Sequence, residues 1–427
     1  MKDSGVEWIG EIPEDWRCIK NKYLLSQLYS GGTPNSADED CYCIENGVPF
    51  VSISDMSTTE HIYSTKKQLT EKGISDKNLK ILHPGTILYS IYATIGAISE
   101  LRVDATISQA ILALILNDNI FSQYYKFNLL AMRDYILSSA NLNTQFNLNA
   151  EIVRNFILVC PPMEEQQSIA DFLDKKCAEI DAVLEKTRES IEEYKKLKQA
   201  VITEAVTKGV RGKREMKDSG VEWIGEIPKE WNIVRGKQVF CETCEYSETG
   251  TEELLTVSHI TGVTPRSQKN VNMFMAENLV GYKICHKGDI AANTMWMWQG
   301  AIGVSKQYGV ISPSYNTYRQ TNGSYVSEYL DYLLRIRPLI DVYSAYSTGI
   351  TASRLRLYPN QFLSLSFILP DIDEQKEIAD YLDKKTTEID TLIAKKEALL
   401  EELDTYKKSL IYEYVTGKKR VSETAHT

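Results

Sequence analysis

A segment of unbroken helical pattern, residues 165–208, constrains the fold of this chain more than any other feature. It contains no Pro or Gly, and its apolar residues recur at steps of four and three between mostly charged positions, as in a coiled coil. We call this row of regularly spaced positions the seam. It consists of Leu173, Cys177, Ile180, Leu184, Thr187, Ile191, Tyr194, Val201 and Ala205. At ~1.5 Å per residue the helix would be roughly 65 Å long, so it needs a partner to cover its apolar stripe.

The partner is predicted to lie in the same chain, because residues 374–417 repeat the pattern. The sequence of residues 169–176 returns with few changes at residues 378–385. The second seam consists of Leu382, Thr386, Ile389, Ile393, Leu400, Leu403 and Leu410. Two helices with matching stripes can cover each other as a two-stranded coiled coil, and packing is the plain interpretation of both stripes.

A second repeat is nearly verbatim, because residues 1–16 return at residues 216–231 with only two residues changed. The chain therefore consists of a short segment, a variable middle and a long helix, followed by the same three parts again. Residues 211–214 link the first helix directly to the second short segment. By analogy, the first short segment should lie at the end of the second helix. The two termini should then be close together in a pseudo-two-fold molecule with antiparallel helices.

The two middle segments predict mixed domains of strands, turns and short helices. Both contain short β-branched and aromatic stretches separated by Gly, Asn and Pro. Residues 85–98 resemble residues 288–302: an apolar strand, a polar and aromatic tip, a Gly and a second apolar strand. The predicted fold class is α+β, with two mixed α/β domains separated by an antiparallel two-helix coiled coil. The predicted segments are residues 1–161, 162–215, 216–370 and 371–427.

Composition excludes several classes of protein. The chain has 427 residues, 43% of them hydrophobic and 25% charged, which is ordinary for a soluble protein. Its net charge of −10 argues against a histone-like polyanion binder, although both middle segments are close to neutral. The sequence has no apparent signal peptide or membrane span, which predicts a cytoplasmic protein. The eight Cys have no zinc-ligand spacing with His, so we expect free thiols and no metal.

Two pairs of motifs resemble those of a known family over the whole chain. Residues 5–13 (Gly-Val-Glu-Trp-Ile-Gly-Glu-Ile-Pro) recur at residues 220–228. Residues 161–173 (Pro-Pro-x-x-Glu-Gln-x-x-Ile-Ala-x-x-Leu) recur from Pro370. In this order the motifs resemble the DNA-specificity subunit of type I restriction-modification systems. The resemblance implies two target-recognition domains, each reading one half of a split, asymmetric double-stranded DNA site. It also implies two adenine-methylating subunits and motor-nuclease restriction subunits as partners, with no membrane involved.

The sequence offers no convincing catalytic motif. It lacks a phosphate-binding loop, a Gly-rich nucleotide fingerprint and the Asn-Pro-Pro-aromatic element of amino-methyltransferases. Asp371, Glu374 and Lys376 faintly resemble a nuclease motif, but they stand at a predicted helix start. There Asp371 and Asp373 are better explained as helix caps and dipole partners. We therefore expect a non-catalytic subunit without a cofactor.

Candidate DNA contacts are polar, aromatic and basic residues in predicted loops. Amides and guanidinium groups suit the edges of adenine and guanine, while Lys and hydroxyl groups suit phosphates. In the first domain the candidates are Lys66, Lys67, Tyr89, Tyr92, Asn143, Thr144 and Gln145. In the second domain they are Asn293, Trp296, Trp298, Gln299, Arg354 and Arg356. For each residue the alternative is that its side chain does not touch DNA and has only a structural role. A Trp would then lie in the core, for example, and a Lys in a solvated turn.

Two further alternatives are open at this stage. Four Trp occupy equivalent places in the two short segments and would either anchor these segments to the helices or contact a partner; they are Trp8, Trp16, Trp223 and Trp231. The alternative function is a coiled-coil assembly scaffold that does not read DNA. A scaffold would explain the helices, but not why the two middle domains diverge while their flanks stay nearly identical.

Overall fold

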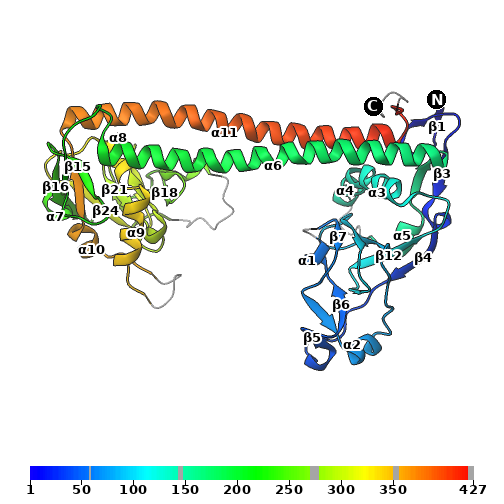
Figure 1. Cartoon of the computed structure of the whole chain (residues 1–427). Helices are drawn as coiled ribbons and strands as arrows, with labels where there is room; N and C mark the ends of the chain where they lie inside the picture. The colour runs from blue at the N-terminus through cyan, green and yellow to red at the C-terminus, as the bar shows by residue number, and fades with distance from the viewer. Residues whose placement is uncertain (57–58, 143–147, 270–277, 350–354, 422–427) are drawn as a thin grey trace. The chain divides into compact units, whose positions relative to one another are not determined.

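The computed structural model describes residues 1–56, 59–142, 148–269, 278–349 and 355–421. The chain divides into two compact units. The first unit combines Met1–Lys186 with Ala398–Thr427, and the second is Thr187–Glu397. Each unit contains one domain rich in strands together with parts of two long helices (Figure 1). No helix in the described ranges is both long and apolar enough to cross a membrane.

The two long helices are α6, Met163–Lys208, and α11, Ile372–Val415, as the heptad patterns predicted. Acidic residues occupy the first turn of both, where they favour the positive end of the helix dipole. The Asp371 carboxylate caps α11 by accepting a hydrogen bond of 2.9 Å from the Glu374 amide, which confirms its predicted capping role. Directly beyond the helix ends, Gly209 and Gly417 adopt φ of 78° and 73°, a conformation that ends helices and favours glycine.

Within each unit, α6 and α11 pack against each other in antiparallel fashion. In the first unit the Phe172 and Tyr414 rings lie 4.5 Å apart, and Lys407 forms an ion pair with Asp181 at 2.6 Å. In the second unit Lys198 pairs with Asp390 at 2.6 Å. The early part of α6 therefore packs against the late part of α11, and the late part of α6 packs against the early part of α11. The predicted antiparallel pairing is confirmed inside each unit.

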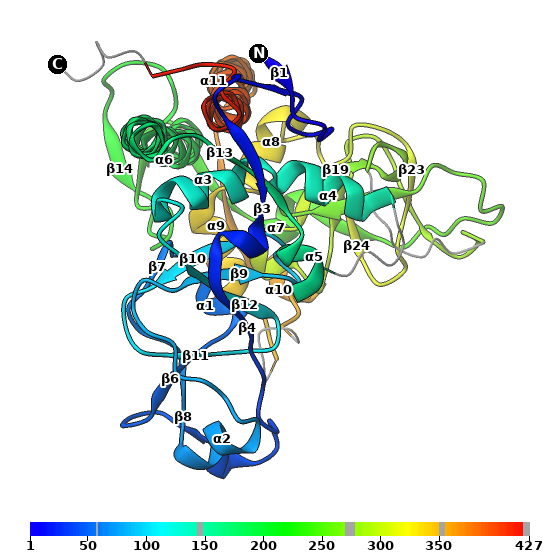
Figure 2. The same cartoon turned by 90° about the vertical axis from the view of Figure 1, so that its right-hand side faces the viewer.

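The domain of the first unit has a larger sheet with strand order β4-β12-β9-β10-β7 and a smaller one with order β11-β6-β8-β5. Helix α3 lies between the larger sheet and the long helices, while the smaller sheet lies at the far end of the domain (Figures 1 and 2). The elements of this unit before α6 are β1 Lys2–Asp3, β2 Glu11–Ile12, β3 Arg17–Lys20, η1 Asn21–Tyr23, β4 Leu25–Ser30, η2 Glu39–Cys41, β5 Tyr42–Cys43, β6 Val48–Val51, α1 Ile53–Met56, β7 His61–Ile62, β8 Lys67–Leu69, α2 Glu71–Asp76, β9 Ile87–Ser90, β10 Ile98–Leu101, β11 Thr106–Ile107, β12 Ile111–Leu116, α3 Ser122–Ala131, α4 Arg133–Leu142, α5 Ala150–Arg154 and β13 Ile157–Cys160.

The domain of the second unit repeats the central part of this plan with a four-stranded sheet of order β17-β24-β21-β22. Strands β16 and β25 form an antiparallel pair, as β3 and β13 do in the first unit. The elements are β14 Met216–Asp218, β15 Glu226–Pro228, β16 Asn232–Arg235, α7 Gly236–Val239, β17 Phe240–Thr243, β18 Leu255–Ser258, β19 Gly262–Pro265, η3 Arg266–Gln268, β20 Lys283–Cys285, β21 Ile290–Ala292, η4 Met297–Gln299, β22 Ile302–Val304, β23 Gly309–Ile311, β24 Asn316–Gln320, α8 Ser327–Leu333, α9 Arg337–Tyr346, α10 Pro359–Ser364 and β25 Ser366–Leu369.

The same glutamine fastens each domain to its long helix. The Gln166 side chain donates to the Pro161 carbonyl at 2.9 Å and accepts from the Phe121 amide at 2.8 Å, just before α3. Gln375 makes the equivalent bonds to the Pro370 carbonyl, at 3.0 Å, and the Val326 amide, at 2.8 Å. Both glutamines are buried, where polar groups need partners. The repeated Glu-Gln motif therefore orients each domain on its helix.

A buried tyrosine makes a second equivalent contact in each unit. Tyr124 in α3 donates to the Val415 carbonyl at the end of α11, at 3.1 Å. Tyr329 in α8 donates to the Val206 carbonyl near the end of α6, at 3.2 Å. Each hydroxyl thus bonds a carbonyl that the end of a helix leaves without an intrahelical partner. The two domains are attached to the helices in the same way.

The short repeated segments are anchored by tryptophan. Trp16 is fully buried, and its Nε1 donates to the Glu165 carboxylate at 3.2 Å. Trp231 is also buried and donates to Glu374 at 2.8 Å. Trp8 and Trp223 are partly exposed and pack against the cores of their units. All four therefore have the anchoring role. The first short segment lies at the end of α11, as predicted, where the Tyr412 hydroxyl donates to the Ile9 carbonyl at 3.3 Å.

Candidate nucleic-acid interface

The two domains present equivalent hairpin tips. Strands β9 and β10 are antiparallel and joined by residues 91–97, while β21 and β22 are antiparallel and joined by residues 293–301. Gly85 and Gly288 precede the first strand of each hairpin with φ of 88° and 91°. The sequence similarity between these regions therefore reflects one shared structure. We take the two tips, together with the first turns of α4 and α9, as the candidate interface.

The tip of the second domain exposes a pair of stacked tryptophans. The rings of Trp296 and Trp298 lie 6.2 Å apart and nearly parallel, and Trp296 is 47% exposed. Between them Met297 points into the core and is 2% exposed. A place in the core was the alternative predicted for the two tryptophans, and the structure gives this place to Met297. Exposed apolar groups that lie together on a surface often mark a site of contact with another molecule.

A small cleft of about 460 Å³ adjoins this tip. It is lined by Trp298 and Gln299 from the tip, by His259, and by Arg337, Asp341 and Ser344 from α9. Arg337 is the first residue of α9 and forms an exposed ion pair of 2.8 Å with Asp341. The cleft combines an aromatic ring, an amide and a guanidinium group, which are groups that recognise nucleic-acid bases.

Two predicted contacts are buried in the structure. Tyr89 lies in β9 with 0% exposure and packs edge-on against Phe156. Asn293 is 5% exposed, and its amide donates to the Tyr315 hydroxyl at 2.9 Å. Neither side chain can contact DNA in this conformation, because each points into the domain and is covered by it.

The other predicted contacts lie in separate places. Tyr92 is exposed at the tip of the first domain, whereas Lys66 and Lys67 lie at β8 in the smaller sheet, with the Lys67 ammonium 5.4 Å from the Tyr42 ring centre. Arg356 donates to the Leu355 carbonyl at 2.8 Å, and its backbone pairs with Thr348. The predicted residues Asn143, Thr144, Gln145 and Arg354 lie outside the described residues.

The predictions missed two arginines beside the tips. Arg133 and Arg337 are the first residues of α4 and α9, the equivalent helices of the two domains. Each ends a similar stretch, Leu-Leu-Ala-Met-Arg in the first domain and Leu-Leu-Arg-Ile-Arg in the second. Aligning the two middle segments across this stretch would have found both residues.

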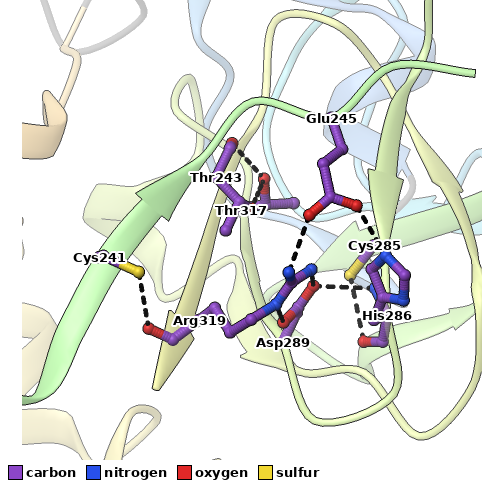
Figure 3. A network of polar contacts seen from close by, with 8 residues as sticks. All are labelled: Cys241, Thr243, Glu245, Cys285, His286, Asp289, Thr317 and Arg319. Carbon is purple, nitrogen blue, oxygen red and sulfur yellow. Dashed lines mark hydrogen bonds and ion pairs between the residues drawn. The ribbon is translucent and has the colours of Figure 1, made fainter. Parts of the chain in front are cut away.

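An ion-pair network connects several strands of the second domain (Figure 3). Arg319 in β24 makes two bonds of 2.8 Å to Asp289 and one of 2.8 Å to Glu245. Glu245 also bonds His286 at 2.8 Å, and the bonds from His286 and Arg319 lower the pKa of Glu245. The network joins β24, the end of β17 and the turn before β21. Because its charged groups satisfy one another, we assign it a structural role.

Comparison with known proteins gives the family. The model of the type I restriction modification DNA specificity domain matches residues 13–193. The type I restriction enzyme MjaVIII specificity subunit of Methanocaldococcus jannaschii is 24% identical over 429 residues, 96% of this chain and 94% of that protein. The putative MjaX specificity subunit of the same organism is 26% identical over 448 residues, 97% and 96% of the two chains. Over nearly its whole length the chain is therefore similar to specificity subunits of type I restriction enzymes.

Other similarities agree with this assignment. The MjaIX specificity subunit of M. jannaschii is 26% identical over 231 residues, 53% of this chain, and the match spans 52% of that relative. The HsdS subunit from Thermoanaerobacter tengcongensis has the same fold, with TM-score 0.53, 16% identity and coverage of 96% and 98%. A chain solved for the structural basis of complex assembly and conformational transition of the type I R-M system has TM-score 0.72 and 15% identity, covering 96% and 100%. The predicted family and fold class are confirmed.

The chain has a larger cleft in its second unit, of about 1060 Å³, between the domain and the helices α6 and α11. Lys287 and Lys306 contribute exposed ammonium groups, while Lys198 and Arg335 are paired with Asp390 and Asp331. Among the described residues, no cluster of His, Cys, Asp and Glu could hold a metal ion. The ammonium groups of Lys287 and Lys306 suit electrostatic contacts with an anionic partner.

Proposed function

We propose that this chain is the subunit that reads a bipartite, asymmetric DNA site for a type I restriction-modification complex. In this proposal residues 1–161 and 216–370 carry the two target-recognition domains. Residues 162–215 and 371–427 carry the spacer helices. The subunit has no catalytic activity of its own, and it serves in the cytoplasm as the scaffold for two adenine methyltransferase subunits and, through them, restriction subunits.

The observation that carries the proposal is that both domains are attached to the long helices by the same contacts, while their hairpin tips differ. Gln166 and Gln375 make the same bonds in the two units, as do Tyr124 and Tyr329. The tips of the two domains differ, since Trp296 and Trp298 have no tryptophan counterparts in the tip of the first domain. Identical attachment with divergent tips is expected of a protein that holds two readers of different sequence in equivalent positions.

The two methyltransferase subunits are inferred from the duplicated short segments. Residues 1–16 and 216–231 fold in the same way, as strand pairs β1-β2 and β14-β15. Each pair also has the same tryptophan contact to its helix. Two nearly identical surfaces favour two copies of one partner. A scaffold without DNA reading remains the second candidate, and exposed stacked rings beside a guanidinium group argue against it.

The first expected result is that site-specific adenine methylation depends on this chain. We expect the methyltransferase subunit of the same system to methylate a split motif only when co-expressed with the full chain. Methylation mapping of the host genome, with and without the chain, measures this. A control strain carries the methyltransferase subunit with a specificity subunit of another system. Methylation of the same motif without the chain would contradict the proposal.

The second expected result is that the two halves of the site are independent. Replacing residues 17–161 by the corresponding domain of a relative should change one half of the methylated motif and leave the other half unaltered. The reason is that β3 begins at Arg17 and α6 begins at Met163, so the exchange keeps both the short segment and the helix. Methylation mapping reads both halves at once.

The matched control for this exchange replaces residues 232–369 instead. It should alter only the half that the first exchange leaves intact. Simultaneous change of both halves in either variant would show that the domains do not read DNA independently.

A further inference from the structure

Three polar side-chain atoms beneath the tip of the first domain have no hydrogen-bond partner in the described part of the chain. They are the Tyr89 hydroxyl, the Thr94 hydroxyl and Nε of Arg133. All three atoms are buried, and a buried donor without a partner destabilises a protein. Native proteins rarely retain several such groups in one place unless they serve function.

Gly96 shows that two of these side chains converge. A Cβ atom on Gly96 would lie 3.1 Å from Cγ of Arg133 and 3.5 Å from the Tyr89 hydroxyl. Gly96 adopts a φ of 77°, which favours glycine, and therefore allows the tip to lie directly on both side chains. The tip residue Ala93 also has a positive φ, 57°, which is unfavourable for a residue with a Cβ.

The lack of partners distinguishes Tyr89 and Arg133 from comparable residues. The buried Tyr125 hydroxyl donates to the Asn21 side chain at 2.8 Å, and Arg319 is held by two carboxylates. Arg335 also has an unpartnered Nε, but its other nitrogens bond the Ile260 carbonyl and Asp331. Across the described ranges, Arg133 has neither an ion pair nor a hydrogen bond through its side chain.

We propose that Arg133 and Tyr89 donate hydrogen bonds to acceptor atoms of the DNA in the first half-site, once the tip of residues 91–97 shifts to uncover them. This proposal rests on the proposed function and adds the residues of the first domain that bind. Arginine and a protonated tyrosine are donors, so their common ligand is an acceptor such as a phosphate oxygen or the O6/N7 edge of guanine. Burial raises the pKa of Tyr89, which keeps its hydroxyl protonated at neutral pH.

The sharpest test is Tyr89→Phe, which removes only the hydroxyl. Because this hydroxyl has no partner in the free protein, we expect the thermal unfolding temperature of the free chain to stay the same or rise. In the complex with methyltransferase subunits, affinity for DNA carrying the methylated motif should fall about tenfold, as expected for the loss of one hydrogen bond between buried groups.

Tyr125→Phe is the matched control, because its hydroxyl is equally buried but already bonded to Asn21. This variant should unfold at a lower temperature and bind DNA with unchanged affinity. If Tyr89→Phe instead lowered the unfolding temperature as Tyr125→Phe does and left DNA affinity unchanged, the proposal would be overturned.

Variants of Arg133 distinguish the two sources of the acceptor. If it belongs to guanine, Arg133→Ala should relax one position of one half-site in the methylation map, and Arg133→Lys should restore it incompletely. If the acceptor belongs to a phosphate, Arg133→Ala should weaken binding to all DNA sequences. The slope of log affinity against log salt concentration should then decrease by about one, and Arg133→Lys should restore most of the affinity. If the Arg133→Ala complex folds and keeps the wild-type affinity and methylated motif, the proposal is refuted. Site-specific methylation by the wild-type complex tests the proposed function separately.

Discussion

Replacing Glu374 by alanine is expected to destabilise the second unit by about 3 kcal/mol, because it removes the acceptor from a buried charged pair. The Glu374 side chain is 1% exposed and accepts hydrogen bonds from Arg214 and from Nε1 of Trp231. Without it, a largely buried guanidinium group and an indole N–H lose their partner. In a unit of this size the unfolding temperature should fall by about 10 °C, which calorimetry of the full chain would measure.

The internal repeat supplies the control, Glu165→Ala. Glu165 holds the equivalent place in the first unit, but its side chain is 34% exposed and lies 3.9 Å from Arg420. The pair with Arg420 is accessible to water and contributes little. The change also removes the acceptor of Nε1 of buried Trp16, so we expect a loss of about 1–2 kcal/mol, smaller than at Glu374. Equal losses at the two positions would contradict the argument that burial sets the difference.

Lengthening both long helices by four residues should lengthen the unspecified gap between the half-sites by one or two base pairs. The insertions are placed after Tyr194 in α6 and after Lys395 in α11, where the Lys396 ammonium lies 5.8 Å from the Tyr194 ring centre. Four residues add about 6 Å and about 400° of rotation, so the apolar stripe returns close to its original direction. DNA rises about 3.4 Å per base pair, and methylation mapping reads the new gap.

Two-residue insertions at the same places are the contrasting variant. In each helix they rotate the apolar stripe on one side of the insertion by about 200° relative to the stripe on the other side, so that one straight pair of helices cannot bury both halves. We expect site-specific methylation to be lost. Full activity with an unchanged gap in the four-residue variant would show that the helices do not set the spacing and act as docking surfaces instead.

The sequence was most informative where a pattern repeats. The seam from Leu173 to Ala205 predicted α6 because apolar residues at helical spacing have one favourable arrangement. The near-verbatim repeat of residues 1–16 predicted where the short segments lie, since a duplicated segment with duplicated surroundings packs in the same way. The fold class followed from these two repeats and from the strand patterns of the middle segments.

Individual site residues were harder to predict, because the sequence does not mark where the fully buried strand β9 ends and the exposed tip begins. Tyr89 and Tyr92 are separated by two residues, yet one is fully buried and the other is exposed at the tip. In the second domain Met297 takes the core position between two accessible tryptophans. Arg133 was missed because its proximity to Tyr89 arises from a tertiary contact across Gly96, which no local pattern records.

The discontinuous first unit has a consequence for synthesis on the ribosome. Its core includes Ile9 and Trp16 from the start of the chain together with Leu410, Ile411 and Val415 from α11. The second unit, by contrast, is one continuous stretch, Thr187–Glu397. A nascent chain therefore completes the second unit first, while the early part of α6 waits with an uncovered apolar stripe. An apolar surface that stays exposed until α11 has been synthesised is prone to aggregation. Translation speed and chaperones should therefore affect the yield of correctly folded first unit more than that of the second.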